Sequence, residues 1–256
     1  MDRQHNSIPS CGPALSDLLR AYAEKYETPE FICGDPSWFM HQVEGPANQE
    51  TTAFVASCLS YGSRSQFMPK IQWLLDCARG DMYEWVRKGQ FEDSVRNDCN
   101  SCFYRLYTVR QMNLFLRRLQ QMLLEYATLG NYVRSHASNG LSAVQAVCKW
   151  FASDDSGHIV PKDAQSACKR ICMFLRWMVR GGSPVDLGLW EPFIDRRTLI
   201  MPLDTHVVGQ ACRLGLISSK STSMAVARRL TQTMAQVFPD DPLKGDFALF
   251  GYGVNS

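Results

Sequence analysis

Hydrophobic side chains recur at helical spacing along most of the chain, whereas the alternation typical of half-buried strands is scarce. The clearest apolar stripe repeats every three or four residues over about five helical turns. Its members are Met112, Phe115, Leu116, Leu119, Leu123 and Tyr126. Glycine and proline interrupt such stripes often enough to predict about ten helices. The pattern therefore indicates an all-α fold.

Two expected helix starts carry a capping signal. Asp204 precedes an apolar stripe that ends at Gly215, so its carboxylate is expected to cap a helix. Asp241 stands before Pro242, which predicts a second carboxylate cap with proline in the first helical position. This second helix would be the last of the chain, short and buried, and would end at Gly251.

No feature of the sequence marks a domain boundary. It contains neither a low-complexity linker nor a repeat with a period of about 20 to 50 residues, so we expect residues 1–256 to form a single domain. Of the 256 residues, 45% are hydrophobic and 20% charged, which is enough for a sizeable core. The 27 Lys and Arg against 25 Asp and Glu leave a net charge of +2. Net charge alone therefore does not indicate a polyanionic partner.

The sequence shows no sign of membrane insertion or export. No apolar run approaches the roughly 18 uncharged residues that a membrane span requires. Residues 1–10 contain no apolar stretch that could serve as a secretory signal. We therefore expect a cytoplasmic protein with no membrane partner.

The ten cysteines are spread over a long chain, mostly within helical patterns, and are expected to be reduced thiols. Cys99 and Cys102 have the spacing of a metal or redox pair, and Cys168 and Cys172 would share a helix face. A four-sulfur zinc site usually needs two such pairs in loops, and the second pair lies in a helical pattern. Structural thiols are therefore the favoured interpretation, and no metal is expected.

Basic side chains are densest in residues 166–180, an expected helix with four cations and no acid. The cations are Lys169, Arg170, Arg176 and Arg180. Such a face either is solvated, with long side chains lying over the core, or contacts phosphate. A second acid-free cluster on the long middle helix allows the same two interpretations, and solvation is favoured there. It comprises Arg105, Arg110, Arg117 and Arg118.

Several segments resemble the helix-hairpin-helix DNA glycosylase superfamily, which includes endonuclease III and the 8-oxoguanine glycosylases. The string PLDTHV, followed by a helix ending in RLGL, is similar to the superfamily's VDTHV segment. Residues 49–75 resemble its early helix, polar turn and second helix, and DFALFGYG resembles its last core helix. The strings KR-x-x-MFLRWMVR, PLD-x-HV and DFALFG look closer still to a bacterial family related to the archaeal 8-oxoguanine DNA glycosylase. As in that enzyme, a long insertion separates Lys169 from Asp204, here 35 positions.

The resemblance implies two helical lobes around a cleft and base excision by Lys169 and Asp204. Breaking an N-glycosidic bond develops positive charge at C1′, which a nearby carboxylate stabilises. A lysine amine can attack C1′ and form a Schiff base whose decay cleaves the strand. Asp204 and Lys169 would fill these roles. Taken singly, the aspartate could be a plain helix cap and the lysine a surface residue.

The resemblance also implies a pocket for an extruded base. Met173 lies four residues after Lys169, on the same helix face, and would line the pocket. Phe250 or Phe247 of the last helix would stack opposite it; all three could instead be core residues.

Further residues are expected at the DNA. The polar turn containing Ser63, Arg64, Ser65 and Gln66 would fill the gap in the duplex, unless it is an ordinary interhelical turn. His206, beside Asp204, would contact either phosphate or solvent.

Two features depart from the superfamily pattern. Its hairpin usually grips phosphate through a Gly-x-Gly turn, but no glycine lies between Gly157 and Lys169. The helix start near Ser166, with Lys162 and Arg170, could substitute through its dipole and charge, although Asp163 opposes this. Many relatives also carry a four-cysteine iron–sulfur loop after the last helix. Because no cysteine follows Cys212, we expect no cluster and no other cofactor.

The sequence therefore predicts a monomeric DNA glycosylase and AP lyase that acts on a damaged base, an oxidised purine, in double-stranded DNA. One alternative is a non-catalytic nucleic-acid-binding protein of the same fold, favoured by the altered hairpin and the nearly neutral charge. Another is a thiol or zinc protein that uses Cys99 and Cys102.

Overall fold

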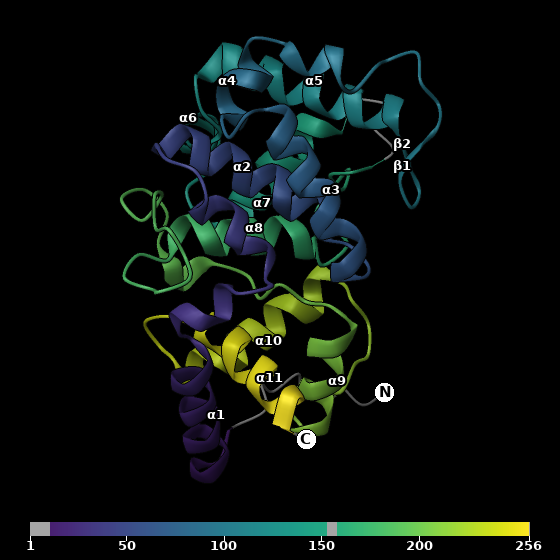
Figure 1. The fold of residues 1–256 in the computed structure, drawn as a ribbon. Helices are drawn as coiled ribbons and strands as arrows, with labels where there is room; N and C mark the ends of the chain where they lie inside the picture. Colours follow the sequence, from purple (N-terminus) through teal and green to yellow (C-terminus); the bar gives the residue numbers. More distant parts are fainter. Residues whose placement is uncertain (1–10, 153–157, 256) are drawn as a thin grey trace, which may run out of the picture.

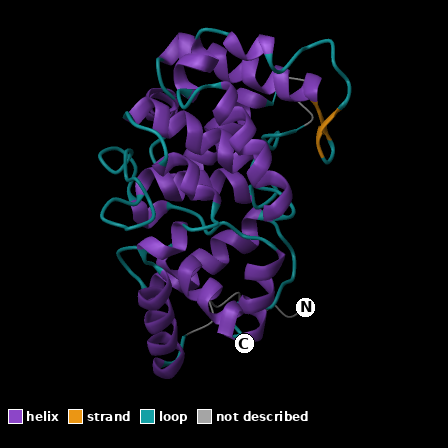
Figure 2. Cartoon of the chain, in the orientation of Figure 1, coloured by secondary structure: helices purple, strands orange, loops and turns teal. Residues whose placement is uncertain are grey.

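The computed structural model describes residues 11–152 and 158–255 and is mostly helical (Figures 1 and 2), which confirms the all-α prediction. Residues 1–10 and Gly157, which entered the sequence argument, lie outside the described residues. The α-helices are α1 (Pro13–Tyr26), α2 (Pro46–Leu59), α3 (Arg64–Cys77), α4 (Met82–Arg87), α5 (Val109–Tyr126), α6 (Leu129–His136), α7 (Gly140–Phe151), α8 (Lys169–Val179), α9 (Thr205–Arg213), α10 (Met224–Val237) and α11 (Lys244–Asn255). The shorter elements are the 3₁₀ helices η1 (Pro29–Ile32), η2 (Pro36–His41), η3 (Gln90–Asp93) and η4 (Arg196–Thr198), and the strands β1 (Cys102–Tyr104) and β2 (Tyr107–Thr108).

The helices lie in two sets in Figure 1. Helices α2 to α8 stack in the upper part of the view, where α2 packs on α4, α8 and η2. Below them, α1 runs along α11, and α11 contacts α9 and α10. A group of packed rings from α2, α5, α7 and α8 forms the centre of the upper set. It consists of Phe54, Phe115, Phe151 and Phe174.

The long middle helix is present as α5, so the clearest sequence stripe is confirmed. Thr108 and Gln111 close its start with reciprocal hydrogen bonds between side chain and backbone. The basic cluster assigned to this helix is partly wrong, because Arg105 lies in the turn between β1 and β2. Arg117 pairs with Glu92, and Arg118 lies over the ring of Trp150. These two arginines therefore have protein partners, which neither interpretation specified.

The basic helix differs from both interpretations at its C-terminal half. Helix α8 begins at Lys169, three residues after Ser166, and Arg176 and Arg180 are 3% and 1% exposed. Both guanidinium groups are ion-paired with carboxylates. They are therefore neither solvated nor free to bind phosphate, because buried carboxylates from other segments compensate their charge.

The two predicted caps have opposite outcomes. Asp204 caps α9 by accepting a hydrogen bond from the Val207 N–H at 2.8 Å. The cap predicted at Asp241 is wrong, because its carboxylate accepts hydrogen bonds from Arg180 at 2.8–3.0 Å instead. The last helix also extends beyond Gly251.

Among the helices of the described residues, none combines the length and the apolar character that a membrane crossing needs.

Candidate functional site

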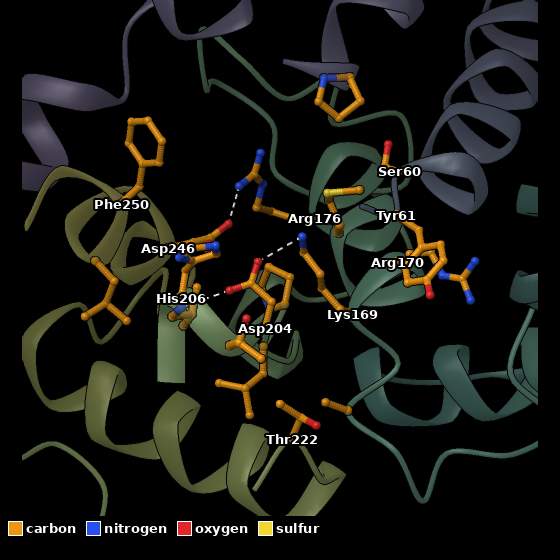
Figure 3. Close-up of a pocket in the computed structure, with 18 of the residues that line it drawn as sticks. Ser60, Tyr61, Lys169, Arg170, Arg176, Asp204, His206, Thr222, Asp246 and Phe250 are labelled. Carbon is orange, nitrogen blue, oxygen red and sulfur yellow. Dashed lines mark hydrogen bonds and ion pairs between the residues drawn. The ribbon is translucent and has the colours of Figure 1, made fainter. Parts of the chain in front are cut away.

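A cavity of about 1040 Å³ lies between the two sets of helices (Figure 3). Its wall is formed by the start of α8, by the turn between α2 and α3, and by the loop before α9. Side chains of α9, α11 and the η1–η2 region also line it. Segments far apart in the sequence therefore meet around one hollow.

Lys169 and Asp204 meet in this cavity, with the lysine Nζ 3.0 Å from the aspartate Oδ2. The side chains are 37% and 29% exposed, so solvent and ligands can reach both. Lys169 is the first residue of α8, and Asp204 immediately precedes α9, which its other oxygen caps. The start of each helix therefore positions one member of the pair.

The pKa of Asp204 is lowered from its ordinary value. Burial acts to raise it, but the Lys169 charge and the hydrogen bonds from the Val207 N–H and the lysine outweigh burial. His206 adds a smaller effect in the same direction. The carboxylate is thus held ionised at the cavity wall.

A second ion pair in the cavity was not anticipated from the sequence. Arg176 pairs with Asp246 of α11, whose side chain is 16% exposed (Figure 3). Burial raises the pKa of Asp246, although Arg176 opposes this shift. Asp246 lies four residues before Phe250, so helical spacing from that predicted pocket residue could have indicated it.

The three residues predicted for a base pocket have different environments. Met173 lines the cavity and is 8% exposed. Phe250 lines it and is 36% exposed, with its ring edge-on to that of Phe31, another lining residue. Phe247 is fully buried under the Arg176 guanidinium and does not line the cavity, so the core alternative describes this residue and not the base-pocket prediction.

The polar turn predicted to enter DNA is only partly a turn, because α3 already begins at Arg64. Ser63, Arg64 and Gln66 are all exposed at the start of that helix. Of these three, Arg64 lines the cavity, and it lies 3.6 Å from Asp35. The sequence argument missed Tyr61, which lies in the turn between α2 and α3 and also lines the cavity.

The remaining predicted DNA contacts are Lys162, Ser166, Arg170 and His206. All but Lys162 line the cavity, and Lys162 is exposed outside it. The Arg170 guanidinium donates to the Cys58 carbonyl at 2.8 Å and approaches the Tyr107 hydroxyl at 3.0 Å. Its side chain therefore has fixed protein partners at the cavity edge.

The start of α8 has no glycine, yet the residue before it is left-handed. Cys168 has a φ of +46° and makes no side-chain cap.

The cysteines form no metal cluster in the described residues. The sulfur of Cys168 lies 3.9 Å from that of Cys148. Cys99 and Cys102 contact Ser101 and the Arg105 carbonyl, respectively. Within residues 11–152 and 158–255, no three His, Cys, Asp or Glu side chains are grouped to hold a metal ion.

Comparison with known proteins gives a family match. Residues 35–255 match the family described as a protein of unknown function (DUF2400). Neither a curated protein nor a solved structure matches the chain. Since the match covers most of the sequence, the chain belongs to the DUF2400 family.

Proposed function

We propose that this protein is a DNA glycosylase with AP-lyase activity that removes an oxidised purine from double-stranded DNA. The observation that carries the proposal is the contact between Lys169 and Asp204 at 3.0 Å in a cavity of about 1040 Å³. Ligand cavities typically measure roughly 300–1,000 Å³, so an extruded nucleotide fits by volume.

The proposed fold is the helix-hairpin-helix glycosylase fold, with two helical lobes around this cleft. Its support is the order of the elements around the cavity: α2, a polar turn, α3, the lysine helix α8, the aspartate before α9, and α11. The glycine hairpin is absent from the sequence, but Cys168 has the left-handed backbone that glycine usually supplies there.

In the proposed reaction, Asp204 stabilises positive charge at C1′. Its lowered pKa keeps the carboxylate ionised, which suits an electrostatic role better than proton acceptance. As the C1′–N bond breaks, the base leaves with the bonding electrons and takes up a proton. The Lys169 ammonium, beside Asp204, is the proposed donor.

The resulting neutral amine adds to C1′. The C1′–O4′ bond then opens as the adduct nitrogen gives a proton to O4′, which leaves an iminium between Lys169 and C1′. Solvent takes up a proton from C2′, and β-elimination breaks the C3′–O3′ bond, so that the strand is cleaved and the bonding electrons leave with the phosphate oxygen O3′. Met173 and Phe250 would contact opposite faces of the extruded base.

Borohydride trapping tests the proposal, because hydride reduces the iminium to a stable amine. We expect a covalent adduct between the protein and an oligonucleotide duplex that contains 8-oxoguanine or an abasic site. The adduct should vanish in Lys169→Ala and persist in Lys149→Ala, which removes an exposed lysine of α7.

Absence of an adduct with the wild-type protein on both duplexes would refute lyase activity. Salt-dependent duplex binding that is unchanged in Asp204→Asn would then support the non-catalytic binding alternative.

A further inference from the structure

The β1–β2 hairpin is attached to the turn between α2 and α3. The Tyr104 hydroxyl donates a hydrogen bond to the Tyr61 carbonyl. The neighbouring Gly62 has a φ of +88°, and a Cβ there would lie 2.7 Å from Nη1 of Arg105. The hairpin also packs on α3, where the Trp73 and Phe103 rings lie 5.9 Å apart. Because Tyr61 and Gly62 line the cavity, the hairpin tip flanks its rim.

Two arginines on this rim have uncompensated charge. The guanidinium carbons of Arg105 and Arg170 lie 4.9 and 5.9 Å from the centre of the Tyr61 ring. Within the described ranges, neither guanidinium has a carboxylate within ion-pair distance, whereas Arg176 deeper in the cavity pairs with Asp186 and Asp246. Arg64 also lies on the rim, but its charge is compensated by Asp35 at 3.6 Å. Excess positive charge therefore lies at the mouth of the cavity on the hairpin side.

The hairpin tip also exposes an apolar side chain. Leu106 follows Arg105 and is 76% exposed, the largest value among the exposed large hydrophobic side chains of the described residues. A single exposed leucine is unremarkable alone. Here it lies beside an arginine that has no carboxylate partner within the described ranges, at the rim of the candidate active site, and that combination suits a ligand that presents both phosphates and stacked bases.

We propose that the tip of the β1–β2 hairpin binds duplex DNA beside the extruded nucleotide. Arg105 contacts a backbone phosphate, and Leu106 packs against the bases in the groove. The inference rests on the proposed function for the identity of the ligand, but its residues differ from those assigned to catalysis. It adds a second DNA-contacting element to the exposed residues 63–66 at the start of α3.

Binding can be measured by fluorescence anisotropy with a labelled duplex that carries a tetrahydrofuran abasic-site analogue, which cannot form a Schiff base. We expect Arg105→Gln to weaken binding about 3- to 10-fold and to lower the slope of log affinity against log salt by about one ion. Leu106→Ala should weaken binding by a similar factor, roughly 3- to 10-fold, with an unchanged salt slope.

Two matched variants control for charge and for apolar area. Arg79 is an exposed arginine with a φ of +52°, close to the +51° of Arg105, so Arg79→Gln removes the same charge in the same backbone conformation. Leu124 of α5 is 63% exposed, so Leu124→Ala removes a comparable leucine. Both control variants should bind the labelled duplex with an affinity within about twofold of that of the wild type. Thermal melting of all four variants checks that each is folded.

The outcomes separate this inference from the proposed function. If the wild type binds the duplex and all four variants bind alike, the hairpin inference is overturned while the catalytic proposal stands. If the hairpin variants bind weakly but no borohydride adduct forms with the wild type, the surface is supported and the enzymatic proposal fails. A wild type that does not bind the duplex would overturn both.

Discussion

Asp204 has two separable roles at the scale of a single residue. One oxygen accepts the Val207 N–H and caps α9, and the other pairs with Lys169. Asparagine caps helices about as well as aspartate, but it is uncharged. The two roles can therefore be separated by substitution.

We expect Asp204→Asn to slow single-turnover release of 8-oxoguanine by about 100-fold or more, because the charge opposite C1′ is lost. Its free energy of unfolding should fall by less than about 1 kcal/mol, since the ion pair is partly exposed. Asp204→Ala should lose about 1 kcal/mol more, because the cap is also removed. If Asp204→Asn released 8-oxoguanine at the wild-type rate, Asp204 would act only as a helix cap.

A buried carboxylate lies away from the cavity at Glu50 of α2. It accepts hydrogen bonds from the N–H groups of Leu129 and Gly130 and from Nε1–H of Trp190, at 2.7–2.9 Å. Burial raises its pKa from 4.5 to about 7, although the three donors oppose the shift. Since the folded pKa exceeds the unfolded one, its contribution to stability is complete below pH 4.5 and declines as pH rises towards 7.

Replacing Glu50 with glutamine should flatten the dependence of the unfolding free energy on pH between about 5 and 7. The variant should be about 1–3 kcal/mol less stable than the wild type at pH 5, because an amide N–H₂ then faces N–H donors. The difference in unfolding free energy between the wild type and Glu50→Gln should be smaller at pH 8. Chemical denaturation across this pH range measures the unfolding free energy, with Glu44→Gln at an exposed position as the control. If the unfolding free energies of the wild type and Glu50→Gln changed with pH in parallel, the prediction would be contradicted.

At the scale of elements, α7 and η4 come unusually close. The Gly140 N–H at the start of α7 donates to the Thr198 hydroxyl at 2.8 Å. A Cβ on Gly140 would lie 2.4 Å from the Thr198 carbonyl oxygen and 2.8 Å from the Leu199 Cα. Because η4 is followed by the segment that ends at Asp204, this contact helps position one wall of the cavity.

Gly140→Ala should therefore cost about 2 kcal/mol or more, because backbone atoms must move. Gly209→Ala in α9 should instead stabilise by about 0.5–1 kcal/mol, since its Cβ meets nothing within 4 Å and alanine favours helix. Urea denaturation measures both changes. Equal effects of the two substitutions would rule out the close approach at Gly140.

At the scale of the whole molecule, one buried arginine joins the two sets of helices. Arg180, directly after α8, pairs with Asp241 before α11 at 2.8 Å and with Glu27 after α1 at 2.6 Å. It also pairs with Asp186 in the following loop. These contacts connect the lysine helix to the ends of α1 and α11, which lie in the lower part of Figure 1.

Arg180→Ala should destabilise the protein by about 3–5 kcal/mol, because it leaves buried carboxylates without their cation. Arg197→Ala, which breaks an exposed pair with Asp195, should change the stability far less, because solvent screens that pair. Thermal and chemical unfolding compare the two. A small loss in Arg180→Ala would show that the network contributes little to joining the two sets of helices.

Part of the candidate site could be predicted because its signals are local. The cap at Asp204 needs only its own helix, and Met173 follows from its four-residue spacing to Lys169. Phe247 and Phe250 could not be separated in this way, because both lie on a largely apolar helix. Both rings pack against Phe31, but only that of Phe247 lies under the buried guanidinium groups of Arg176 and Arg180, so tertiary packing leaves Phe250 as the ring at the cavity.

By itself, the sequence determined the helical class, the long helix α5 and the cap of α9, because periodic burial and capping act within a few residues. Only the tertiary structure decided that Arg176 and Arg180 are buried and that Asp241 caps no helix. The carboxylates that pair with Arg180 include two that lie 61 and 153 residues away. From the sequence alone, a charged side chain on a helix predicts a solvated face. The cost of burying that charge is compensated only by oppositely charged partners, which here come from distant parts of the chain.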